Sequence, residues 1–195
     1  MRLPKLTSDD YSPRQREIAD RIGGARGGQV RGPFVCMLHS PEVCDKVEAL
    51  ASQMRFKSSL PERLREFSLL IAARFWDAQD SWNAHLGKAH AAGLPEAVTQ
   101  ALAERREPPF EAEDEAVFYR FCKELLETHL VSDETYAKAQ ALFGDEGMVD
   151  AVACLGTFSM LAMVLNTFQV DLDPAKRPFA DMQDYTRTAP RAPLG

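Results

Sequence analysis

Residues 60–94 read LPERLREFSLLIAARFWDAQDSWNAHLGKAHAAGL, and the pattern of this stretch sets the fold class of the whole chain. In its first half, apolar residues stand at positions 64, 67, 70 and 71, which is the spacing of one face of an α-helix. Proline at position 61 suits a first helical turn. The spacing therefore predicts a helix that carries Glu66 and ends near Arg74.

A helix boundary falls in the middle of the same stretch. Asp77 has the side chain of an N-cap, and Asp80 stands three residues later in the capping-box position. A second helix is expected over residues 78–92, with Gly93 as its C-cap. Two helices with so short a connection form a hairpin or a sharp bend.

The rest of the chain also has helical patterns. Further helices are expected over residues 34–56, 95–107, 113–130 and 132–144. Residues 146–170 are apolar on nearly all sides, which is typical of a central buried helix. No segment alternates with period two, so we predict an all-α protein. We expect an N-terminal arm with a glycine-rich loop over residues 1–33, a helical domain over 34–172, and a C-terminal tail over 173–195 that is mobile or wraps a partner.

The glycine-rich loop is centred on residues 21–34, RIGGARGGQVRGPF, which hold five of the 11 glycines and three arginines. Glycine at this density disfavours a helix, and the absence of a following Gly-Lys-Ser/Thr excludes a P-loop. Two interpretations remain. The loop is either a flexible connector or an anion-binding lip in which Arg26 or Arg31 meets a substrate carboxylate.

Composition narrows the function classes. A chain of 195 residues with 45% apolar residues fits one folded domain, and the net charge of −6 argues against a nucleic-acid binder. No run of 18 uninterrupted apolar residues predicts a membrane span, and no apolar signal segment opens the chain, so we expect a cytoplasmic protein. The four cysteines, Cys36, Cys44, Cys122 and Cys154, form no CxxC and no zinc-spaced cluster, and read as small buried hydrophobes.

Taken together, residues 60–94 resemble the core motif of the carboxymuconolactone decarboxylase family, which includes the AhpD-type alkylhydroperoxidases. The resemblance rests on a Leu-Arg-Glu helix, a bend, a short helix with a histidine, and Ala-Gly-Leu. The flanking GPF and LGTFSMLAMVLNTF segments are similar to those of the longer members. The resemblance implies an AhpD-like helical bundle that assembles as a homo-oligomer, either dimer, trimer or hexamer.

In the AhpD-type members the motif holds a glutamate, a CxxC pair and a histidine four residues after the second cysteine. The histidine falls on His85 and the glutamate on Glu66, but the two cysteine positions are Ala78 and Ser81. Alanine and serine cannot perform dithiol peroxidase chemistry. The resemblance therefore favours the thiol-free decarboxylases, which use a motif histidine and neither metal nor cofactor.

Those decarboxylases act on small carboxylated lactones, so the resemblance implies a small anionic substrate. Loss of CO2 leaves an enolate, which needs an apolar pocket, a cation and an acid. His85 suits the acid role and Glu66 the role of its partner, although His85 as a core histidine and Glu66 as a salt-bridge partner of Arg63 or Arg74 are open alternatives. The residues expected to bind substrate are Trp82, Trp76, Asp80, Arg74 and Arg31, with core packing the alternative for both tryptophans.

Three functions follow. The first is a cofactor-independent enzyme, similar to the decarboxylases, that acts on a carboxylated lactone or a related product of aromatic catabolism through His85. The second is an alkylhydroperoxidase or peroxiredoxin-type activity in which one of the four cysteines is displaced into the pocket. The third is a non-catalytic oligomer that binds a small molecule. None of the three requires nucleic acid or a membrane.

Overall fold

The computed structural model describes residues 1–25, 28–170 and 175–182, and every regular element in them is a helix. The predicted all-α class is thereby confirmed. In chain order the elements are η1 (Ser8–Asp10), α1 (Pro13–Ala25), α2 (Phe34–Met37), α3 (Pro41–Phe56), α4 (Glu62–Phe75), α5 (Gln79–Ala91), α6 (Glu96–Ala103), α7 (Glu113–Thr128), α8 (Asp133–Phe168) and η2 (Ala180–Met182).

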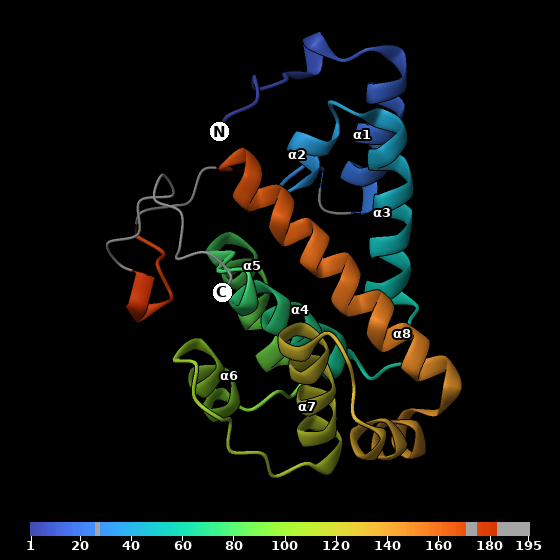
Figure 1. The fold of residues 1–195 in the computed structure, drawn as a ribbon. Coiled ribbons are helices and arrows are strands. Elements are labelled where there is room, and N and C mark those ends of the chain that lie inside the picture. The colour runs from blue at the N-terminus through green and yellow to red at the C-terminus, as the bar shows by residue number, and fades with distance from the viewer. Residues whose placement is uncertain (26–27, 171–174, 183–195) are drawn as a thin grey trace.

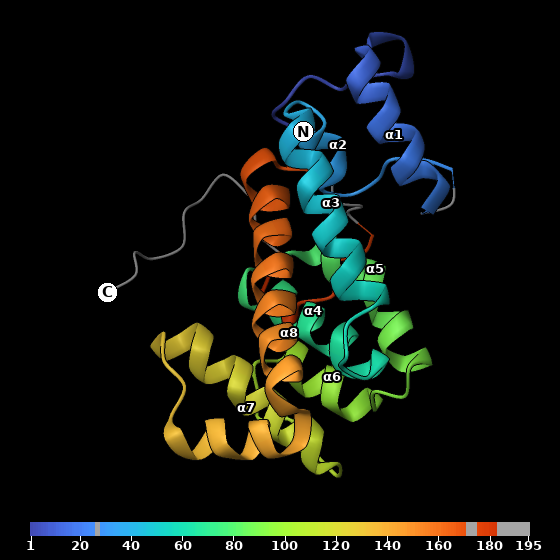
Figure 2. The ribbon, with the colours of Figure 1, turned by 90° about the vertical axis from the view of Figure 1, so that its right-hand side faces the viewer.

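Helix α4 is the centre of the packing. It contacts α3, α5, α6, α7 and α8, and its side chains from Glu66 through Arg74 are all buried. Helix α8 runs diagonally across the molecule with α3 alongside it, and α1 covers the outer side of α3 (Figures 1 and 2). The core is therefore built around the first half of the 60–94 stretch, as its apolar face predicts.

Helix α1 corrects the sequence prediction that the glycine-rich region is a loop throughout. The helix includes Gly23 and Gly24, because both fall in its last turn, where helix propensity matters least. Ile18 and Ile22 are fully buried in the core, and this packing offsets the low propensity of the segment. The chain turns only afterwards, where the Gly28 N–H donates to the Gly23 carbonyl at 2.7 Å and Gly28 adopts φ +94°.

The boundary between α4 and α5 lies where the sequence places it, but the predicted cap does not form. The N-cap of α5 is Ala78, and no side chain caps it. Asp77 instead adopts a left-handed backbone with φ +53° and pairs with Arg74 and with Arg105. The Asp77 carboxylate therefore pairs with these two arginines and does not accept hydrogen bonds from the backbone N–H groups at the start of α5.

Helix α8 joins two helices that the sequence separates. Gly144 has φ +66° and ψ 178°, a conformation that only glycine adopts readily, and it bends the helix there. The helix is long and apolar enough to cross a membrane, but 56% of its most apolar window is buried inside the fold. This burial is what a core helix of a globular protein shows.

The C-terminal segment, which we define as residues 175–182, packs on the rest of the chain. Phe179 is fully buried and meets Trp82 edge-to-face at 5.2 Å between ring centroids. The Asn83 side chain donates to the Lys176 carbonyl at 2.7 Å. The prediction of a mobile or partner-wrapping tail is wrong for these residues, because aromatic burial fixes them; residues 183–195 lie outside the described part.

Candidate active site

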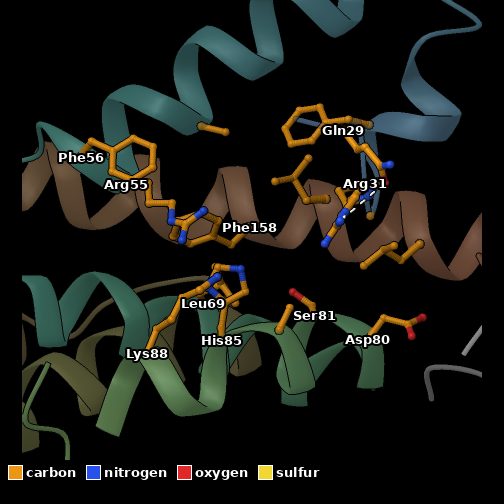
Figure 3. A pocket seen from close by; sticks show the side chains of 17 residues that line it. Gln29, Arg31, Arg55, Phe56, Leu69, Asp80, Ser81, His85, Lys88 and Phe158 are labelled. Atoms are coloured by element: carbon orange, nitrogen blue, oxygen red, sulfur yellow. Dashed lines mark hydrogen bonds between the residues drawn. The ribbon is translucent and has the colours of Figure 1, made fainter. Parts of the chain in front are cut away.

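A cavity of about 570 Å³ lies between α5 on one side and α3, α8 and residues 29–34 on the other (Figure 3). Its walls combine aromatic and aliphatic side chains with a few charged ones, which is the usual make-up of a small-molecule site. The lining residues are Gln29, Arg31, Gly32, Pro33, Phe34, Ala51, Arg55, Phe56, Leu69, Asp80, Ser81, Ala84, His85, Lys88, Phe158, Leu161 and Leu165.

His85 lines this cavity and contacts Glu66, which lies behind the lining. The Nδ1 atom of His85, from α5, lies 2.7 Å from Oε2 of Glu66, from α4. Glu66 is only 5% exposed, and its other oxygen lies 3.8 Å from Nε of Arg55. Glu66 therefore pairs with His85 and Arg55, and neither Arg63 nor Arg74 is its partner: Arg63 pairs with Asp114 and Glu115, which is a separate cluster.

Burial and charge set the protonation of this pair. Burial lowers the pKa of His85, and it outweighs the Glu66 carboxylate, which raises that pKa. Burial raises the pKa of Glu66, but the His85 hydrogen bond and the charges of His85, Arg55 and Lys88 bring it below its ordinary value. The resting pair is thus an ionised Glu66 and a neutral His85.

The hydrogen bond also selects the tautomer. An ionised carboxylate only accepts, so Nδ1 of His85 carries the proton and donates it to Glu66. The free lone pair is then on Nε2, the ring nitrogen that does not contact Glu66. His85 was expected to act as an acid, but its resting form is that of a base.

Cationic side chains gather beside His85. Arg55 and Lys88 line the same end of the cavity as His85, while Arg31 and Asp80 lie toward the other end (Figure 3). Arg31 and Asp80, both predicted to bind substrate, thus line the same cavity as His85, while Arg26 lies outside the described residues. Sequence reasoning missed Arg55 and Lys88. Lys88 was findable, since it follows His85 by three residues on one helix, whereas Arg55 comes from another helix.

The two tryptophans do not line the cavity, contrary to expectation. Trp82 is 1% exposed and packs against Phe179 on a different side of α5 from the cavity. Trp76 stands at the bend, where its carbonyl accepts a hydrogen bond from the Asn166 side chain. Trp82 serves the core, which was the alternative interpretation, whereas Trp76 is half-buried and belongs neither to the core nor to the cavity lining. A step of three residues keeps side chains near one another but still turns them by about 60° around a helix axis.

Arg74 is likewise absent from the cavity. It is 3% exposed and its guanidinium binds the Asp181 carboxylate with contacts of 2.8 and 2.9 Å. It also stacks over the Phe179 ring at 4.3 Å and donates to the Ala103 carbonyl at 2.8 Å. Arg74 therefore anchors the C-terminal segment, and a substrate carboxylate has no access to it in this arrangement.

The positions that hold cysteines in the AhpD-type motif have different environments. Ala78 is buried, whereas Ser81 lines the cavity one helical turn before His85. All four cysteines are buried, and none of them lines the cavity. Burial raises the pKa of each thiol, to about 11 for Cys44 and about 12 for Cys154. Among the described residues, no group of three or more His, Cys, Asp and Glu side chains is arranged to hold a metal.

Comparison with known proteins supports the fold. No family model matches the sequence, and no curated protein matches it. A crystal structure described as an alkylhydroperoxidase AhpD core, an uncharacterized peroxidase-related protein from Ralstonia eutropha JMP134, has a TM-score of 0.71 to this chain. The match covers 90% of this chain and 94% of that one at 15% sequence identity. The likeness confirms the predicted AhpD-like helical fold.

Proposed function

We propose that the protein is a cofactor-independent enzyme that moves a proton at a carbon atom of a small anionic substrate, with His85 as the proton carrier. One observation carries the proposal. The neutral imidazole of His85 is oriented by a 2.7 Å hydrogen bond to an ionised, buried Glu66 at the wall of a cavity. A base fixed by a second group is the arrangement that general base catalysis requires.

The charges on the cavity wall support an anionic substrate. The lining contains three cationic side chains, Arg31, Arg55 and Lys88, and one carboxylate, that of Asp80. The remaining lining is largely apolar and includes Phe34 and Phe158, so the cations act in a partly water-excluded space. The sequence resemblance gives the finer proposal: the substrate is a carboxylated lactone or a related product of aromatic catabolism, and the reaction is its decarboxylation.

The same residues support both directions of proton transfer. As a base, Nε2 of His85 takes a proton from carbon next to a carbonyl, and Glu66 stabilises the imidazolium that forms. In a decarboxylation, the electrons of the broken C–C bond form an enolate, and His85 returns a proton to carbon. A substrate carboxylate beside His85 favours the imidazolium that this step needs. Arg55 and Lys88 stabilise the enolate oxygen in either case.

The cysteines favour this proposal over peroxide chemistry. A peroxidatic thiol reacts as the thiolate, and burial disfavours the thiolate at Cys44 and Cys154. All four thiols also lie away from the cavity lining. We further propose a cytoplasmic homo-oligomer, measurable by light scattering, with no nucleic-acid or membrane partner.

The test compares His85→Ala with His90→Ala in a panel of small carboxylated lactones and unsaturated acids. His90 is a matched control because it lies on the same helix, bonds to Thr99 and stays outside the cavity. The readouts are solvent deuterium incorporation by NMR and CO2 release. Loss of a general base costs about 10²- to 10⁴-fold in rate, so His85→Ala should lose turnover and His90→Ala should keep it.

Two results would count against the enzyme. Wild-type turnover in His85→Ala removes His85 from the chemistry. Tight binding of a panel member without any deuterium exchange or CO2 release supports the non-catalytic binding protein instead.

A further inference from the structure

A hydroxyl group stands beside the base. Ser81 lies four residues before His85 on α5, and both side chains line the cavity (Figure 3). Residues at this spacing face the same side of a helix, with Cβ atoms about 6 Å apart. Helical side chains also lean toward the N-terminus, which brings the His85 ring over the turn that holds Ser81. Within the described part of the chain the Ser81 hydroxyl makes no hydrogen bond, and this includes His85, so the contact between the hydroxyl and Nε2 of His85 has to form when a substrate binds.

We propose that Ser81 is a nucleophile, and that Ser81, His85 and Glu66 form a hydroxyl–imidazole–carboxylate triad that hydrolyses small esters or lactones through an acyl-enzyme. The proposal rests on the same Glu66–His85 pair as the proposed function. A serine hydroxyl becomes nucleophilic when a base within reach takes its proton and a third group orients that base. Glu66 supplies the orientation through Nδ1, and this leaves Nε2 as the proton acceptor.

The reaction balances without any further reactant except water. Oγ of Ser81 bonds to the acyl carbon while its proton passes to Nε2 of His85. The acyl–oxygen bond of the substrate then breaks, and the departing alcohol takes that proton. In the second half, water loses a proton to His85 and attacks the acyl-serine, which releases the acid and restores the Ser81 hydroxyl.

The surroundings of the triad suit this chemistry. The tetrahedral intermediate carries a negative charge, and Arg55 and Lys88 line the same end of the cavity as His85. Other hydroxyls are badly placed to compete: those of Thr157 and Ser159 are buried and do not line the cavity. Among the residues that line the cavity, Ser81 alone is a serine or threonine.

The test uses an irreversible aryl phosphonate, which labels activated serines, and an aryl acetate as substrate. Wild type, Ser81→Ala, Ser81→Cys and the control Ser8→Ala are compared; Ser8 is an exposed serine of η1, outside the cavity. We expect one phosphonyl group per wild-type chain, mapped to Ser81 by peptide mass spectrometry. Ser81→Ala should take up none and should hydrolyse the aryl acetate at least about 100-fold more slowly.

Ser8→Ala should match wild type, and Ser81→Cys should accept an acetyl group from the aryl acetate on the new thiol, which shows a folded and reachable position 81. The proposal is overturned if wild type takes up no label, if the label maps to His85 or Lys88, or if Ser81→Ala hydrolyses the acetate like wild type. Deuterium exchange and CO2 release on the same preparations test the proposed function separately, because neither needs an acyl-enzyme.

Discussion

Replacement of Glu66 by glutamine tests how the structure tunes His85. Glutamine keeps the size of the side chain and an oxygen that accepts the Nδ1 proton, but it removes the negative charge 2.7 Å from the ring. The carboxylate charge attracts the imidazolium but not the neutral ring, and an opposite charge within about 4–6 Å typically moves a pKa by about 1–3 units, so its removal costs the imidazolium roughly 1.4 kcal/mol relative to the neutral ring at the low end of that range. At about 1.4 kcal/mol per unit, the pKa of His85 should fall by about one further unit.

The direction follows from the balance in the wild type. Burial already holds the pKa of His85 below 6.5, and Glu66 is the group that opposes burial. Its neutral replacement also leaves the charges of Arg55 and Lys88 unbalanced, and both lower the pKa of His85. If the free enzyme reacts through neutral His85, kcat/KM rises with pH to a plateau, and in Glu66→Gln that rise moves to lower pH by the same amount.

NMR titration of the His85 ring protons measures the shift directly, and a kcat/KM profile on an active panel substrate provides the second readout. The matched control is Glu62→Gln, since Glu62 is an exposed glutamate one turn earlier on the same helix. An unchanged or higher His85 titration midpoint in Glu66→Gln would show that the carboxylate does not control the ring. A kcat/KM that falls with rising pH would assign the acid form to the free enzyme and refute the base assignment.

Three further perturbations address stability and the thiols. Gly144→Ala should lower the free energy of urea unfolding by about 1–3 kcal/mol, because φ +66° with ψ 178° strains any side chain. The control Gly156→Ala adds a Cβ with nothing within 4 Å in the same helix, so it should be neutral or stabilising by up to about 1 kcal/mol, and equal losses in both would contradict the strain argument. Asp181→Asn should cost about 0.5–1 kcal/mol in the same assay, because this exposed carboxyl pairs with two arginines, which hold its pKa below its usual value although partial burial raises it. That contribution is present above about pH 4 and is lost as pH falls, so a wild type that keeps full stability at pH 3 would count against it. Cys44 and Cys154 should react with a thiol reagent at neutral pH at rates limited by opening of the fold, and peroxide should consume neither; rapid loss of thiols would revive the peroxidase alternative.

Local pattern was a sound guide wherever the structure depends on neighbours along the chain. The apolar face at positions 64–71, the break before α5 and the buried helix near the C-terminus all follow from spacing and from glycine and proline. The errors occur where tertiary contacts outweigh propensity. Gly23 and Gly24 are helical because the burial of Ile18 and Ile22 stabilises their helix. Asp77 does not cap α5, because its carboxylate pairs with two arginines.

The candidate site shows the same division. The motif likeness paired Glu66 with His85, and the 2.7 Å contact between them agrees with that pairing. Trp82 and Arg74 were expected in the pocket because they share a helix with those two residues. A helix has a full circle of directions, and sequence spacing does not say which direction meets a cavity and which meets the core.

The sequence by itself thus determined the all-α class, the helix break between Glu66 and His85 and the absence of the motif cysteines at Ala78 and Ser81. Only the tertiary structure decided that Arg55 from α3 faces Glu66, that Ser81 lines the cavity, and that Arg74 binds the C-terminal segment. The physical reason is the distance along the chain between the residues that interact. Helix formation depends on residues three or four apart, whereas a cavity and the pKa values within it depend on the burial and charges that distant helices bring together.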